Sequence, residues 1–247
     1  SMQVYKQLKI LTARPNKKVQ KNIKHHMYGV VDLTKKFSTG QWLKAAIKKI
    51  KEVKKRKKVP ILVGGTGLYF QSLIDGLVKI PEIPHKFRNK IRLKQKKEGQ
   101  KKFFKKLLKI DPKVKDKFDP NDSQRSIRAF EIKSFTKISM YEWINNTKSE
   151  FKNDEFVKLY IDFKREDLIK RISSRSTKMI KDGAIKEVKK FIKLKIKKDL
   201  SVNRVIGIDE LTQHLDKKIN LDQAQELISI KTRQYAKRQA TWARSRM

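Results

Sequence analysis

A short apolar run followed by closely spaced glycines is the feature that most constrains the fold of this chain. Residues 60–63 read Pro-Ile-Leu-Val, and residues 64–67 read Gly-Gly-Thr-Gly. A wholly apolar run of this length favours a strand that is buried on both faces, as in a parallel sheet. Helical periodicity precedes the run in residues 41–58 and follows it in residues 68–74. Helix, buried strand, glycine turn and helix in this order predict an α/β core.

The pattern changes after this region. Residues 81–155 show helical periodicity and no convincing strand, whereas residues 157–163 again resemble a strand and are followed by helices. We therefore predict an α/β core that is interrupted by an all-helical insertion. The core is expected to comprise residues 1–80 and 156–247, and the insertion residues 81–155.

The charge balance is strongly positive. The 64 Lys and Arg against 25 Asp and Glu give a net charge of +39, and polyanions are the natural partners of such a chain. The alternative is that an AT-rich genome has enriched lysine on solvated helix faces. The sequence has no cysteine, which excludes disulfides and Cys-based zinc sites and fits a reducing cytoplasm. No signal-peptide pattern opens the chain, and no apolar run approaches the roughly 20 residues that span a bilayer. We expect a cytoplasmic protein without a membrane partner.

The glycine turn at residues 64–67 can serve a ligand. Glycines let a backbone approach closely, and the N-terminus of the following helix offers N–H groups to an anion. A tight turn without a ligand is the alternative. The turn is not a Walker loop, because no Gly-x-x-x-x-Gly-Lys-Ser/Thr occurs in the sequence. His25 and His26 are adjacent and so point in different directions, and no carboxylate cluster indicates a metal site formed by this chain alone.

Arg175 is a candidate for binding an anion. It follows Ile172 by three residues and precedes Met179 by four, so we expect it on the apolar stripe of a helix that faces the core. A guanidinium in that position must meet an anion, because an unpaired buried charge is costly. The anion can be a ligand or an internal carboxylate; alternatively, the side chain reaches out to solvent.

Two basic segments have the composition of nucleic-acid-binding surfaces. Near the C-terminus, Arg238 lies between Tyr235 and Trp242 on a helix rich in lysine and arginine, and such helices bind phosphates and stack bases. In the insertion, residues 124–128 read Gln-Arg-Ser-Ile-Arg and follow Asp122, a candidate helix cap. Gln and Arg recognise base edges and phosphates, and a solvated helix face is the alternative.

In their order and spacing, these segments resemble the tRNA dimethylallyltransferase family. The likeness covers residues 1–6, 12–15, 25–26, 64–69, 120–125, 128–129, 171–175, 204–207 and 232–239. It implies a P-loop nucleotide-kinase-like core with a parallel sheet and a helical insertion. It also implies transfer of a dimethylallyl group from its diphosphate to N6 of the adenosine 3′ of the tRNA anticodon, with release of diphosphate.

The resemblance further implies partners and roles. The partners are a tRNA anticodon stem-loop and dimethylallyl diphosphate, with Mg²⁺ as cofactor, and we expect a monomer. Thr66 is implied to lie near the reacting centre, and Arg175 to hold the diphosphate. The implied tRNA-binding residues are Ser1, Met2, Gln3, Gln124, Arg125, Arg128, Arg204, Thr232, Arg233, Lys237, Arg238 and Gln239.

The sequence departs from the family at two places. The phosphate-binding (ATP-binding) loop and the aspartate that serves as base are expected before Ser1. We therefore expect residues 1–247 alone to be inactive in transfer. We also expect Mg²⁺ to be held mainly by groups outside residues 1–247. Ile208 and Asp209 replace an aromatic and a basic residue after Gly207, which puts a local tRNA contact in doubt. Two alternatives stay open: a non-catalytic RNA-binding protein, and an isopentenyltransferase that acts on free adenylate.

Overall fold

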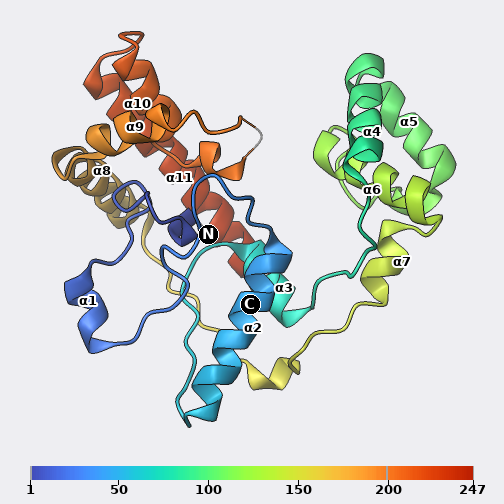
Figure 1. Cartoon of the computed structure of the whole chain (residues 1–247), viewed down its shortest axis with the longest axis horizontal. Coiled ribbons are helices and arrows are strands. Elements are labelled where there is room, and N and C mark those ends of the chain that lie inside the picture. The colour runs from blue at the N-terminus through green and yellow to red at the C-terminus, as the bar shows by residue number, and fades with distance from the viewer. Residues whose placement is uncertain (1, 199, 247) are drawn as a thin grey trace. The chain divides into compact units, whose positions relative to one another are not determined.

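The computed structural model describes residues 2–198 and 200–246 (Figure 1). Its contacts divide the chain into two units. Unit 1 runs to Gln71 and resumes at Asn153, and unit 2 comprises Ser72–Lys152. Each unit has a hydrophobic core of its own.

Unit 1 contains most of the α-helices, including the long C-terminal helix. They are α1 (Lys17–Asn22), α2 (Thr39–Lys55), α3 (Gly67–Ile74, which continues into unit 2), α8 (Arg165–Lys181), α9 (Ala184–Lys193), α10 (Ile208–Leu215) and α11 (Leu221–Arg246). Three short 3₁₀ helices accompany them: η1 (Met2–Val4), η3 (Asn153–Glu155) and η4 (Ser201–Arg204).

Unit 2 is helical throughout its regular structure. It contains α4 (His85–Glu98), α5 (Gln100–Ile110), η2 (Pro112–Val114), α6 (Ser123–Thr136) and α7 (Met140–Asn145). Its core is formed by one stripe of α5, with Phe103 and Leu107 fully buried, against Phe130 of α6. As predicted, Asp122 caps α6, and its side chain accepts a hydrogen bond from the backbone N–H of Arg125 at 2.9 Å.

The predicted P-loop nucleotide-kinase-like core with a parallel sheet is wrong. Within residues 2–198 and 200–246 the structure has no β-strand, only one isolated parallel bridge between Tyr5 and Val31. Residues 60–63 and 157–163 have no regular secondary structure, and most of their apolar side chains are exposed, for example Ile61 at 81%, although Leu62 packs on the core of unit 1. An apolar run shows that burial of a segment is favourable, but it does not supply the neighbouring backbone that a strand needs for its hydrogen bonds.

Helices α8 and α11 run antiparallel in unit 1. Asp162, just before α8, lies 3.3 Å from Arg244 near the end of α11, whereas Thr177 near the end of α8 accepts a hydrogen bond from Gln225 early in α11 at 3.0 Å. Ile228 of α11 is buried in the core beside them. This pairing holds α11 against α8 within unit 1, the unit that also carries the glycine turn (Figure 1).

Candidate functional site

The glycine turn packs directly against α11. A Cβ atom added to Gly65 would lie 2.0 Å from Nε2 of Gln239, and one added to Gly67 would lie 2.4 Å from Cδ2 of Trp242. Both distances are too short for non-bonded atoms, so the missing side chains are what allow the helix to approach the turn. Thr66, which lies between the two glycines, is thereby held beside the cationic helix.

Four aromatic residues connect the turn to other segments. The ring of Tyr69, on α3, stacks on Trp42 of α2 with centroids 4.1 Å apart. Burial, with smaller contributions from the nearby phenols of Tyr5 and Tyr235, raises the pKa of Tyr69 to about 12. Tyr69 therefore lies close to both the N-terminal segment and α11, and segments that are distant in the sequence meet at one place.

The N-terminal segment is held by hydrogen bonds. Tyr5 shares a hydrogen bond of 3.1 Å with the hydroxyl of Ser201 on η4, the 3₁₀ helix that also carries Arg204. The side-chain amide of Gln3 donates to the carbonyl of Ala13 at 3.1 Å. Met2 begins η1 and is half-buried, and Ser1 lies outside the described residues.

A single carboxylate fixes the loop that follows. Glu187 of α9 accepts hydrogen bonds from three successive backbone N–H groups, those of Lys9, Ile10 and Leu11, at 2.6, 3.0 and 2.9 Å. Charge-assisted bonds of this kind are stronger than neutral ones. The carboxylate thus ties the N-terminal segment to the helical part of unit 1.

Arg175 differs from its expected position. Ile172, Ser176 and Met179 form the buried stripe of α8, and Arg175 lies at the edge of this stripe and is exposed. Ser176 takes the central position, where its hydroxyl shares a hydrogen bond of 3.0 Å with Ser229 of α11. Partial desolvation lowers the pKa of Arg175 from its ordinary value. Its guanidinium has no hydrogen bond or ion pair within the described part of the chain and is free to bind an anion.

The predicted tRNA-binding residues of α11 differ in how far they are engaged in contacts within the protein. Arg233 pairs with Glu226 at 3.0 Å, and the Arg238 guanidinium lies 5.7 Å from the ring centre of Tyr235. Lys237 is exposed to solvent. Two further members make contacts within the protein: Thr232 donates to the carbonyl of Ile228 at 2.7 Å, and Gln239 packs on the glycine turn.

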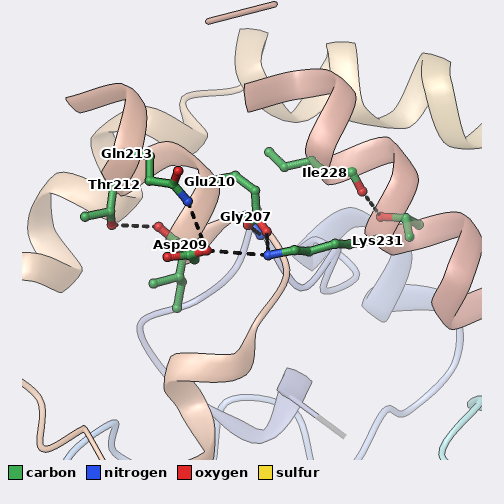
Figure 2. A network of polar contacts seen from close by, with 9 residues as sticks. Gly207, Asp209, Glu210, Thr212, Gln213, Ile228 and Lys231 are labelled. Carbon is green, nitrogen blue, oxygen red and sulfur yellow. Dashed lines mark hydrogen bonds and ion pairs between the residues drawn. The ribbon is translucent and has the colours of Figure 1, made fainter. Parts of the chain in front are cut away.

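A polar network joins α10 to α11 (Figure 2). The ammonium of Lys231 binds the buried carboxylate of Glu210 and lies 3.5 Å from Asp209. Glu210 also accepts the backbone N–H of Gly207 at 2.7 Å. These contacts, with the hydrogen bond to Glu210 first, raise the pKa of Lys231. Asp209 therefore pairs with a lysine of α11, at the position where the resemblance implied a basic residue.

The predicted residues of unit 2 lie along α6. Gln124 and Arg125 are exposed, and Arg125 lies 3.5 Å from Asp122. Arg128 pairs with the buried Glu131 at 3.2 Å. Two residues that sequence reasoning missed, Arg88 and Arg92 of α4, also pair with Glu131. Their spacing of four places them on one face of a helix, but the sequence alone does not show that this face packs on α6.

The described residues do not form a metal site. Within residues 2–198 and 200–246, no group of three or more His, Cys, Asp or Glu side chains is arranged to hold a metal ion. Mg²⁺ prefers oxygen ligands, and two carboxylates of unit 1, Glu187 and Glu210, are already bound to backbone N–H groups. These residues therefore do not fit Mg²⁺, and no chemical step is assigned to it.

Comparison with known proteins identifies the family. The model of the IPP transferase family matches residues 3–246. The chain belongs to the IPP transferase family. The resemblance inferred from the sequence is thereby confirmed, and with it the enzyme class, a transferase. No helix of the described residues is long and apolar enough to cross a membrane.

Individual relatives of this IPP transferase family member cover nearly all of its length. A tRNA dimethylallyltransferase of Pelagibacter ubique (strain HTCC1062) is 74% identical over 247 residues, which are 100% of this chain and 79% of that protein. The crystal structure of a full-length tRNA isopentenylpyrophosphate transferase from Bacillus halodurans is similar with a TM-score of 0.67 and 30% identity, over 99% of this chain and 76% of that one. A eukaryotic dimethylallyltransferase, described as acting on tRNA, is similar with a TM-score of 0.83 and 30% identity, over 98% of this chain and 61% of that one.

Proposed function

We propose that this chain belongs to an enzyme that transfers a dimethylallyl group from dimethylallyl diphosphate to N6 of the adenosine 3′ of a tRNA anticodon. The similarity to a tRNA dimethylallyltransferase at 74% identity supports the reaction. The observation in the structure that carries the proposal is the contact of the glycine turn with α11. It brings Thr66, implied to lie near the reacting centre, beside the helix that carries Arg238 and Gln239.

The reaction determines what the residues must do. The lone pair of N6 forms a bond to C1 of the dimethylallyl group while the bond between C1 and the diphosphate oxygen breaks. The amine loses one proton, and the diphosphate leaves with the bonding electrons. Negative charge therefore grows on the leaving group, and a cation fixed beside it lowers the barrier.

Arg175 is the residue to which we assign this charge stabilisation. Its guanidinium is unpaired within the described residues, and its pKa is lowered by desolvation. A guanidinium remains protonated at neutral pH in spite of such a shift and can bind phosphate oxygens with two parallel N–H groups. Within residues 2–198 and 200–246, no internal carboxylate of the kind considered from the sequence pairs with it.

The RNA is recognised, in this proposal, by α11. Exposed Lys237 and Arg238 provide contacts to phosphates, and Tyr235, which is 38% exposed, provides a face for stacking a base. An enzyme that modifies a base must take that base out of its stack and hold it. The neighbouring glycine turn with Thr66 is where we place the target adenosine.

A transfer assay tests the proposal. The enzyme that contains this chain is incubated with Mg²⁺, radiolabelled dimethylallyl diphosphate and either tRNA or AMP, and we expect label in tRNA alone. Label in AMP but not in tRNA would favour the free-adenylate alternative. Salt-sensitive tRNA binding without any transfer would favour a non-catalytic RNA-binding protein. The same assay on residues 1–247 alone tests the expectation that these residues do not transfer.

A further inference from the structure

Three arginines of unit 2 surround one buried carboxylate. Glu131 of α6 is 1% exposed. Its Oε2 accepts hydrogen bonds from Nε of Arg88 and Nη1 of Arg128, each at 3.2 Å. Its Oε1 lies 3.8 Å from Nε of Arg92. We refer to Arg88, Arg92 and Arg128 as the arginine cluster.

The cluster has an excess of positive charge at the surface. The side chains of Arg88, Arg92 and Arg128 are 32%, 53% and 41% exposed, whereas Glu131 is inaccessible to solvent. One buried negative charge faces three positive ones, so two positive charges remain unbalanced. Within the described part of the chain, the cluster has no other acidic partner.

Most of the hydrogen-bond donors of the cluster have no acceptor within the part of the chain that the structure describes. A guanidinium carries five N–H donors in a planar fork. Glu131 accepts one hydrogen bond from Arg88 and one from Arg128, and it is too far from Arg92 for a hydrogen bond. The remaining donors can bind phosphate oxygens in pairs.

The cluster is rigidly mounted. Arg88 and Arg92 are four residues apart on α4, and Arg128 and Glu131 are three apart on α6. Both helices contribute to the buried core of unit 2, which includes Ile91 between the two arginines of α4. Arginines held in this way lose less conformational entropy when they bind than free surface side chains do.

We propose that the arginine cluster binds phosphates of the RNA backbone and that Glu131 is the positioning residue that holds the three guanidiniums together. This inference rests on the proposed function, which provides RNA as the substrate. Gln124, one turn before Arg128 on α6 and exposed, lies where a base edge next to those phosphates can be contacted. Glu131 itself touches no RNA, because it is buried beneath the arginines.

Glu131→Gln separates positioning from general attraction. The substitution keeps the shape of the side chain and raises the net charge of the protein by one. Long-range attraction alone would then bind RNA more tightly. Loss of positioning weakens binding instead, by roughly tenfold if one charge-assisted contact is lost. The measurement is fluorescence anisotropy with a labelled tRNA anticodon stem-loop at several salt concentrations.

A matched pair on α4 provides the second measurement. Arg92→Ala and Lys90→Ala each remove one positive charge from the same helix, and Lys90 is exposed and has no hydrogen bond or ion pair within the described residues. We expect Arg92→Ala to weaken RNA binding and to reduce the slope of log affinity against log salt by about one. Lys90→Ala should change the slope less, and circular dichroism checks that both variants fold.

The outcomes distinguish this inference from the proposed function. Equal effects of Arg92→Ala and Lys90→Ala, with RNA binding by the unmodified protein intact, would overturn the inference and leave the proposed function standing. Tighter binding by Glu131→Gln would do the same. An unmodified protein with no salt-sensitive RNA binding would overturn the RNA-binding step of the proposed function, and the inference with it. If Glu131→Gln does not fold, the pair on α4 decides.

Discussion

The α11 segment in unit 1 and the arginine cluster in unit 2 both present positive charge to solvent, but they are built differently. On α11 the cations follow one another along a single helix, and Arg238 lies over the ring of Tyr235. In unit 2 the cations converge from two helices on the buried Glu131. The first surface depends on close packing against the glycine turn, and the second on a buried opposite charge. We therefore expect substitutions that change packing but not charge to disturb the α11 surface. Substitutions that remove a charge should disturb the arginine cluster.

Arg175→Ala is expected to have the largest effect and extends the comparison to a cation that has no partner among the described residues. In the complete enzyme, the transition state should lose about 2–4 kcal/mol of stabilisation, the scale of one lost preorganised contact. Thermal stability should change little, because Arg175 is exposed and unpaired within the described residues. The measurements are kcat/KM for tRNA prenylation and a melting curve. A large loss of stability with unchanged activity would make Arg175 a structural residue and contradict its assignment.

Gly67→Ala tests whether packing holds the α11 surface. The added Cβ would lie 2.4 Å from the ring of Trp242, so α11 or the turn must shift. Overpacking of this kind costs about 1–3 kcal/mol of unfolding free energy. Gly64→Ala is the matched control, because a Cβ there meets no atom within 4 Å. Urea denaturation of both variants measures the difference, and equal stability of the two would show that the contact with Trp242 is not needed.

Arg125→Ala combined with Arg128→Ala tests the charge-based surface of unit 2. We expect tRNA binding to weaken by about tenfold, the size of one or two lost charge-assisted contacts. The affinity for dimethylallyl diphosphate should stay unchanged, because Arg175, to which we assign the diphosphate, lies in unit 1. The two affinities are measured by anisotropy and by calorimetry. An equal loss of both would remove the division of labour between the units.

The two surfaces also differ in how far the sequence could predict them. The α11 segment is contiguous, so its cations and aromatics were recognisable at once, and the cap at Asp122 is a local feature of the same kind. In the arginine cluster, Arg88 lies 43 positions from Glu131 along the sequence, whereas Arg128 lies 3 positions from it. Only Arg128 could be proposed from local spacing. Arg88 and Arg92 required knowledge of which face of α4 packs on α6.

The prediction of a sheet failed for a related reason. Val63 belongs to the apolar run that predicted a buried strand, and Leu159 to the second predicted strand, yet they are 83% and 81% exposed. Helical hydrogen bonds form within a segment, so a periodic sequence can predict a helix by itself. A strand takes its hydrogen bonds from a distant partner, whose presence no local pattern guarantees. Arg175 shows the same limit on a smaller scale, because helical spacing did not distinguish the middle of the buried stripe from its edge.

The smallest expected effect concerns Tyr69, where the turn, the N-terminal segment and α11 meet. Burial raises its pKa to about 12 in the folded protein, whereas the pKa of a tyrosine in an unfolded chain is about 10. Above that lower value the unfolded chain loses the phenolic proton and the folded chain keeps it, so this contribution to stability is complete below pH 10 and is lost towards pH 12. The unfolding free energy of Tyr69→Phe should therefore fall less steeply between these pH values than that of the unmodified protein, because phenylalanine has no proton to lose. Comparing the slopes by urea denaturation cancels the titration of the many lysines, which both proteins share. Identical slopes would mean that Tyr69 does not stay buried where the turn, the N-terminal segment and α11 meet, and the packing-based side of the comparison would lose this residue.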